Sequence, residues 1–208
     1  MRLVVGKEPF RRILKWAQYA LFACAVLLLG YSGSALADAW MFQRRESMNL
    51  DRLLRDRRAA SEGAPAAATD GLIGRIEIPR LLFSAVVVEG IDKTSLRHAV
   101  GHIPGTTLPG QSGNVGLAGH RDTLFRSLKD LRIKDEIRFS TLSGDFKYEV
   151  ESLIVVDPND AGVLAPSHEN VLTMVTCYPF FYIGAAPKRF VVRARQVSPL
   201  TLARSTVE

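Results

Sequence analysis

The sequence predicts an all-β domain, a closed barrel or a sandwich with a few short helices, behind an N-terminal transmembrane helix. Seven short segments of β-branched or alternating residues follow one another within about 125 residues, and Gly, Pro, Asn and Asp separate them. Residues 16–37 carry no charge, and this stretch is long enough for the roughly 20 apolar residues that cross a membrane.

The predicted strands begin at Leu72 and consist of residue types that suit a pleated, half-buried surface. In chain order they are LIGRIEIP, SAVVVEG, GNVGLAG, DEIRFST, DFKYEVESLIVVD, NVLTMVTC and KRFVVRARQV. Short helices are predicted at residues 93–100 and 123–131, and a long loop with one helical turn is predicted at 157–170.

Composition divides the chain into five segments. In order they are a cytoplasmic basic segment at 1–15, a transmembrane signal-anchor at 16–37, a juxtamembrane helix and linker at 38–71, the β domain at 72–198 and a tail at 199–208. The formal charge of +6 belongs to the part before the β domain, because residues 59–208 hold 16 basic and 16 acidic side chains. A neutral domain lacks the basic surface that binds phosphate backbones, so no nucleic-acid partner is expected.

Basic residues before the apolar stretch place the N-terminus in the cytoplasm and the β domain outside it, as a single-pass membrane protein. A cleavable signal peptide is the alternative, since the triplet ALA before Asp38 fits a small-x-small cleavage site. We favour the anchor because the stretch exceeds the usual signal-peptide core of about 7–15 residues. Trp40 and Phe42 also flank it. Cys24 inside the stretch is interpreted as a small apolar helix residue.

The segment after the anchor, residues 44–58, places Met48, Leu50, Leu53 and Leu54 among charges at helical spacing. We interpret it as a solvated juxtamembrane helix. Contact of its arginines with anionic lipid headgroups is the alternative, which makes membrane lipid an expected partner.

Cys177 is the cysteine of the exported part and stands at the end of the apolar run VLTMVT. Because Cys24 lies in the membrane stretch, Cys177 has no partner for an internal disulfide, and both a buried structural role and a reactive role stay open. His120 follows the run NVGLAG at a similar strand exit, and Arg189 begins the strand after Cys177. This order could bring a thiol, an imidazole and a guanidinium to one end of a barrel.

These three groups suit acyl transfer. A thiolate attacks a carbonyl carbon, an imidazolium protonates the departing amine, and a guanidinium donates hydrogen bonds to the oxyanion. Arg121 is less suited to the third role, because a residue adjacent to His120 on an extended segment points the opposite way. Arg193 and Arg195 share the alternation of Arg189 along the final strand.

The segments LAGHRDTLFRSL, TMVTCYPF and PKRFVVRA resemble the three catalytic segments of the sortases, a family of membrane-anchored cysteine transpeptidases. The resemblance extends over residues 74–197. Met174 replaces the leucine of the family motif T-L-x-T-C, a substitution that keeps volume and polarity. The motifs TCYPF, GHIPGT, GHRDT and PKRF are most similar to class D sortases.

The resemblance implies a closed eight-stranded β-barrel with Cys177 as nucleophile, His120 as general acid and then base, and Arg189 as stabiliser of the oxyanion and substrate. It implies cleavage of an LPxT(G/A)-type C-terminal sorting signal on a protein substrate through a thioester. The acyl group then passes to an amine of the cell envelope, such as a peptidoglycan precursor, and no cofactor is implied. The substrate groove is expected to be lined by neighbours of the catalytic residues, namely Leu117, Ala118 and Thr176.

Other interpretations of the same residues stay open. A cysteine peptidase would resolve the thioester with water, and a catalytically silent barrel would only bind exported peptides. His98 and His102 are four residues apart, but Gly101 and Pro104 interrupt any helix that would carry both. No further ligand follows at a suitable spacing, so no metal site is expected.

Overall fold

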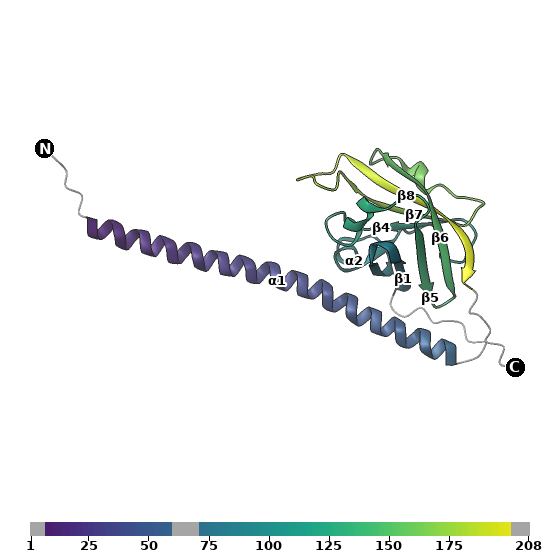
Figure 1. Cartoon of the computed structure of the whole chain (residues 1–208), viewed down its shortest axis with the longest axis horizontal. Coiled ribbons are helices and arrows are strands. Elements are labelled where there is room, and N and C mark those ends of the chain that lie inside the picture. Colours follow the sequence, from purple (N-terminus) through teal and green to yellow (C-terminus); the bar gives the residue numbers. More distant parts are fainter. Residues whose placement is uncertain (1–6, 60–70, 201–208) are drawn as a thin grey trace. The chain divides into compact units, whose positions relative to one another are not determined.

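The structure is a computed structural model that describes residues 7–59 and 71–200. Residues 1–6 of the predicted basic segment, 60–70 of the predicted juxtamembrane helix and linker, and 201–208 of the predicted tail lie outside the described residues. The chain divides into two units, Met1–Met41 and Phe42–Glu208. Helix α1, Lys7–Ala59, contributes to both units (Figure 1).

The first unit contains the apolar part of α1. By length and composition, Leu14–Ser34 is long and apolar enough to cross a membrane, and none of this window is buried within the described structure. This helix overlaps the uncharged stretch at 16–37, so the prediction of an N-terminal apolar helix is confirmed, and Leu14–Ser34 is a candidate membrane span.

The second unit is a closed barrel of eight strands (Figure 1). The strands are β1 Leu72–Ile78, β2 Phe83–Glu89, β3 Val100–His102, β4 Asn114–Ala118, β5 Glu136–Thr141, β6 Asp145–Val156, β7 Val171–Tyr178 and β8 Lys188–Leu200. Around the barrel they follow the order β1, β2, β3, β4, β7, β8, β6 and β5, which closes on β1. The pairs β2–β3 and β4–β7 are parallel, and the other pairs are antiparallel. The predicted all-β barrel is confirmed.

Short helices connect the strands as predicted. Helix α2, Lys93–His98, begins where the Asp92 carboxylate accepts hydrogen bonds from the backbone N–H groups of Thr94 and Ser95. The second predicted helix is a 3-10 helix, η2, Leu124–Asp130. Two further 3-10 turns are η1, Pro79–Leu81, and η3, Ala161–Leu164, and the latter is the single turn predicted in the long loop.

Alternate residues of the strands point into the barrel and form one apolar core. Helix η2 adds the fully buried side chains of Phe125 and Leu128 to this core. Gly119, at the exit of β4, allows Phe125 to come close, because a Cβ at Gly119 would lie 2.8 Å from Phe125 Cδ2. The backbone N–H of Phe125 also donates to the His120 carbonyl at 3.0 Å. The packing of η2 therefore fixes the backbone at His120.

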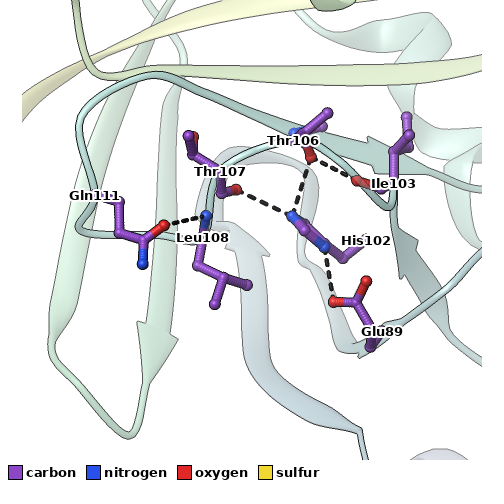
Figure 2. A network of polar contacts seen from close by, with 8 residues as sticks. Glu89, His102, Ile103, Thr106, Thr107, Leu108 and Gln111 are labelled. Carbon is purple, nitrogen blue, oxygen red and sulfur yellow. Dashed lines mark hydrogen bonds and ion pairs between the residues drawn. The ribbon is translucent and has the colours of Figure 1, made fainter. Parts of the chain in front are cut away.

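The entry into β4 is fixed by a buried histidine. His102 Nδ1 lies 2.8 Å from a Glu89 carboxylate oxygen, and Nε2 lies 3.0 Å from both the Thr107 carbonyl and the Thr106 hydroxyl. Figure 2 draws these contacts. Thr106 Oγ1 in turn accepts from the Gly116 backbone N–H at 3.0 Å. This network ties the turn after β3 to β4, so the role of His102 in the structure is to order a loop.

The prediction of a solvated juxtamembrane helix is wrong for one face of α1. Leu50 is fully buried in a small cluster with Leu72 and Val86 of the barrel wall. Gln43 accepts from the Val86 backbone N–H at 3.0 Å and donates to the His98 carbonyl at 2.5 Å. Gln43 and Leu50 of α1 thus pack against the barrel.

An ion pair between Arg80 and Asp135, the residue just before β5, is expected to make the stability of the barrel depend on pH. Arg80 donates two hydrogen bonds to the Asp135 carboxylate, at 2.5 and 2.6 Å. These bonds hold the pKa of Asp135 below its ordinary value, although burial opposes the shift. Because the folded-state pKa is depressed, the stabilisation is present above the ordinary carboxyl range and is lost as pH falls through the folded-state pKa.

Asp135→Asn is therefore expected to lower the free energy of unfolding at pH 7 by about 1–2 kcal/mol, since a charge-assisted pair is lost. The difference from the wild type should shrink toward pH 3. Urea unfolding followed by tyrosine near-UV circular dichroism measures it. The control Asp157→Asn, which removes a surface pair with Lys188, should cost less than about 0.5 kcal/mol. If Asp135→Asn lost as much stability at pH 3 as at pH 7, the ion pair would not be the source of the pH dependence.

Candidate active site

The three candidate catalytic residues lie at the ends of three adjacent strands. Strand β7 lies between β4 and β8 in the barrel. On one side Cys177 pairs directly with Arg189 of β8, and on the other Val175 pairs with Ala118 of β4. The pairing of β4 with β7 ends at this pair, two residues before His120 on one segment and two residues before Cys177 on the other. Cys177 is thus flanked by an imidazole-bearing and a guanidinium-bearing segment.

His120 is exposed, whereas Cys177 and Arg189 are half-buried. Among the described residues, no hydrogen bond joins the Cys177 thiol to the His120 imidazole. The segments that carry them are nevertheless joined. Thr176 Oγ1 donates to the Gly119 carbonyl at 2.7 Å, and the Gly119 backbone N–H donates to the Val175 carbonyl at 3.3 Å. Residues next to each candidate therefore set the distance between the two strand exits.

The arginines near the site have different partners. Arg189 Nη1 donates to the carbonyls of Ala186 and Lys188 at 3.3 and 3.0 Å, which holds the guanidinium at the start of β8. Arg193 pairs with Thr173, four residues further along the outer face of the strand. Arg195 forms ion pairs with Glu151 and Glu169. Arg189 is the one of these three that pairs with Cys177.

The outer face of β4 and β7 forms the surface next to Cys177. Because side chains alternate along a strand, Ala118, Val175 and Cys177 face outward and are half-buried. Leu117 instead lies fully buried in the barrel core, and Thr176 is buried with its hydroxyl on Gly119. Two of the three expected groove residues therefore lie beneath this surface, while Val175 is a surface residue that the sequence reasoning missed.

The loop before β7 covers the far end of the same surface. Asn114 Nδ2 donates to the carbonyls of Val163 and Ala165 at 3.2 Å, and Asn114 Oδ1 accepts from Thr173 Oγ1 at 2.7 Å. These bonds pin η3 against β4 and β7, so the loop at 157–170 borders the outer surface that leads to Cys177.

Three aromatic rings support the strand ends below the site. Tyr178 stacks on Phe190 with ring centroids 6.4 Å apart, and Phe180 packs edge-on against both, at 6.0 and 5.3 Å. Phe180 and Phe190 also pack on the barrel core. These residues belong to β7, the loop after it and β8, so the cluster holds together the three segments around Cys177. Sequence reasoning did not single them out.

Possible metal ligands were also compared across the described part of the chain. No group of three His, Cys, Asp or Glu side chains there could hold an ion. Both ring nitrogens of His102 are engaged by Glu89, Thr106 and Thr107.

The fold and the candidate site define a class of protein, a closed β-barrel with a cysteine and an arginine paired on adjacent strands and a histidine just after the end of a third strand. Residues 76–197 match the family of the sortase domain. Because this match covers more than half of the chain, the protein belongs to the sortase family.

Individual relatives agree with this assignment. The chain is 37% identical over 126 residues to Sortase D of Bacillus subtilis (strain 168), which covers 60% of this chain and 64% of that protein. It is 32% identical over 125 residues to Sortase SrtE1 of Streptomyces coelicolor, 51% of this chain and 36% of that protein. The chain thus spans less than two thirds of the length of these curated relatives.

The fold also matches a solved structure of a Clostridium perfringens Sortase D5 transpeptidase. The TM-score is 0.63 at 26% identity, and the alignment covers 76% of this chain and 99% of that one.

Proposed function

We propose that this protein is a membrane-anchored cysteine transpeptidase. It cleaves an LPxT(G/A)-type C-terminal sorting signal after the threonine and transfers the protein to an amine of the cell envelope. The observation that carries the proposal is the strand order: β7, which bears Cys177, lies between β4, which leads into His120, and β8, whose Arg189 pairs with Cys177. Membership of the sortase family and similarity to a structure described as a transpeptidase support it.

Acylation uses all three residues. The Cys177 thiol passes its proton to His120, and the resulting thiolate attacks the threonine carbonyl carbon of the sorting signal. Arg189 donates hydrogen bonds to the oxyanion of the tetrahedral intermediate. The C–N bond then breaks, the departing amine takes the proton from His120, and a thioester on Cys177 remains.

Transfer reverses the proton movement. The acceptor amine attacks the thioester carbon while His120 takes its proton, and the C–S bond breaks to release Cys177. A new amide joins the sorted protein to the acceptor. Ala118 and Val175, on the outer face next to Cys177, are proposed to contact the sorting signal.

The candidate span at Leu14–Ser34 is proposed to anchor the enzyme in the cytoplasmic membrane. Basic residues before the span favour a cytoplasmic N-terminus and an extracytoplasmic barrel. Such an arrangement places the enzyme where exported proteins and peptidoglycan precursors meet.

Incubation of the full chain with peptides containing Leu-Pro-x-Thr-Gly or Leu-Pro-x-Thr-Ala, with and without a glycine oligomer, tests the proposal. Mass spectrometry should detect cleavage after threonine and, with the amine, a ligated product. Hydrolysis at the same rate with no ligation would identify a peptidase. If neither peptide is cleaved and no thioester forms, the proposed function fails.

The role of Arg189 predicts a selective loss. Arg189→Ala should reduce kcat by about 10²–10³-fold, the effect of removing one oxyanion donor. Arg193→Ala is the matched control, because Arg193 lies on the same strand and face but pairs with Thr173, and it should keep near wild-type kcat. Steady-state kinetics with the cleaved peptide measures both; equal losses in the two variants would remove Arg189 from the mechanism.

A further inference from the structure

Arg121, next to His120, is almost fully buried, with 7% of its surface exposed. Nevertheless it belongs to a turn whose next residue, Asp122, is 71% exposed. Burying a guanidinium costs free energy unless its N–H groups are paired, so the contacts that Arg121 makes indicate what the position is for.

The partners of Arg121 lie in the loop that follows Cys177. Arg121 Nη1 donates to the Pro179 carbonyl at 3.0 Å, and Nη2 donates to the carbonyls of Tyr182 and Gly184 at 2.7 and 3.1 Å. Nε lies 3.4 Å from the Asp122 carboxylate. The planar fork of arginine can reach several acceptors in fixed directions, which a lysine ammonium on its flexible stem does not do.

Beyond Phe180, which packs on the barrel core, most of the loop that Arg121 holds is exposed to solvent. Phe181 is 75% exposed and Ile183 fully exposed. Side-chain contacts of this loop with the rest of the barrel include the Lys129 ammonium, 5.2 Å from the centre of the Phe181 ring. At the other end of the loop, Arg189 binds the Ala186 carbonyl. A shift of the loop would therefore move the guanidinium of Arg189 as well.

The residues on both sides of His120 are thus hydrogen-bonded to the segment around Cys177. On one side, the Gly119 carbonyl accepts from Thr176, the residue before Cys177. On the other, Arg121 binds the carbonyl of Pro179, two residues after Cys177. We infer that Arg121 is a positioning residue, which fixes the loop between β7 and β8 and so sets the geometry of His120, Cys177 and Arg189.

Steady-state kinetics of Arg121→Ala and Arg121→Lys in the full chain test the inference. This kinetic test rests on the proposed function, because it measures cleavage of the sorting peptide. A misplacement of reacting groups by about 1 Å can cost roughly 100-fold in rate, so kcat should fall by about 10- to 100-fold in both variants. KM should change less than kcat, because the outer surface of β4 and β7 is left intact. Arg126→Ala, an exposed arginine on η2, is the control and should keep wild-type kinetics.

Limited proteolysis with chymotrypsin provides a readout that does not depend on activity. Loss of the carbonyl contacts should accelerate cleavage after Phe181 and Tyr182 while the melting temperature of the barrel stays close to that of the wild type. A role in global stability would instead lower the melting temperature and accelerate cleavage throughout the barrel.

Gly184→Ala approaches the same contact from the loop. Gly184 has a φ of +104° and open space at its Cβ position, so alanine strains the backbone there without a clash. It should weaken the hold on the Gly184 carbonyl, speed loop cleavage and lower kcat, even if Arg121→Ala does not fold.

Full kcat in Arg121→Lys, or unchanged loop cleavage in all Arg121 and Gly184 variants, would overturn the inference. A wild-type chain that forms no acyl-enzyme would overturn the proposed function instead, and the proteolysis would still report whether Arg121 holds the loop.

Discussion

Replacing Cys177 by alanine is expected to reduce cleavage of the sorting peptide to background, a loss on the order of 10⁴-fold or more for removal of a covalent nucleophile. The expectation follows from the position of Cys177, half-buried at the exit of β7 and paired with Arg189. Alanine keeps the strand and removes only the sulfur. Peptide cleavage by the purified full chain in detergent measures the effect.

The chain offers a matched control for this prediction. Cys24 lies exposed in α1, within the candidate membrane span. Cys24→Ala should keep full activity, and the double variant should behave like Cys177→Ala. Activity that survives in Cys177→Ala but falls in Cys24→Ala would place the reactive thiol elsewhere and exclude the proposed mechanism.

Replacing His120 by glutamine should produce the second largest loss, about 10²–10⁴-fold in kcat, because glutamine cannot exchange the proton that acylation and transfer both require. The exposed His168 provides the control, and His168→Gln should react at the wild-type rate. The two variants are compared by steady-state kinetics at the same pH.

Changing the leaving group of the substrate distinguishes a proton-transfer role of His120 from a structural role. A substrate in which an ester replaces the scissile amide needs less protonation of the departing atom, so the defect of His120→Gln should shrink by about tenfold or more with the ester. A defect of the same size with both substrates would mean that His120 supports the site without delivering the proton.

The strands could be predicted from their residue types, and their boundaries agree closely with the structure. β3 was missed because Val100–His102 is only three residues long and follows α2 after one residue, which leaves no alternating run to detect. The packing of Leu50 was also missed. Its partners, Leu72 and Val86, come from two strands far along the chain, and the spacing of apolar residues in a helix does not reveal what it packs against.

The catalytic candidates could be located from sequence because each stands near the end of a strand, Cys177 and His120 at strand exits and Arg189 at a strand start, but their surroundings could not. Leu117 and Thr176 are the sequence neighbours of the outward-facing Ala118 and Cys177. Because successive side chains of a strand point to opposite faces, Leu117 and Thr176 point inward and are buried. Arg121 is buried in a turn, whereas Arg189 is half-buried and pairs with Cys177. The three carbonyl acceptors of Arg121 depend on the path of the loop after β7, which local residue preferences do not determine.

Mass measurement of the intact chain during turnover tests the central claim most directly. Mixed with a Leu-Pro-x-Thr-Gly or Leu-Pro-x-Thr-Ala peptide without added amine, the wild-type chain should gain the mass of the peptide up to and including threonine. Peptide mapping should place this acyl group on Cys177, and a glycine oligomer should remove it as a ligated product. Cleavage of the peptide with no such adduct, or an adduct on another residue, would contradict the account.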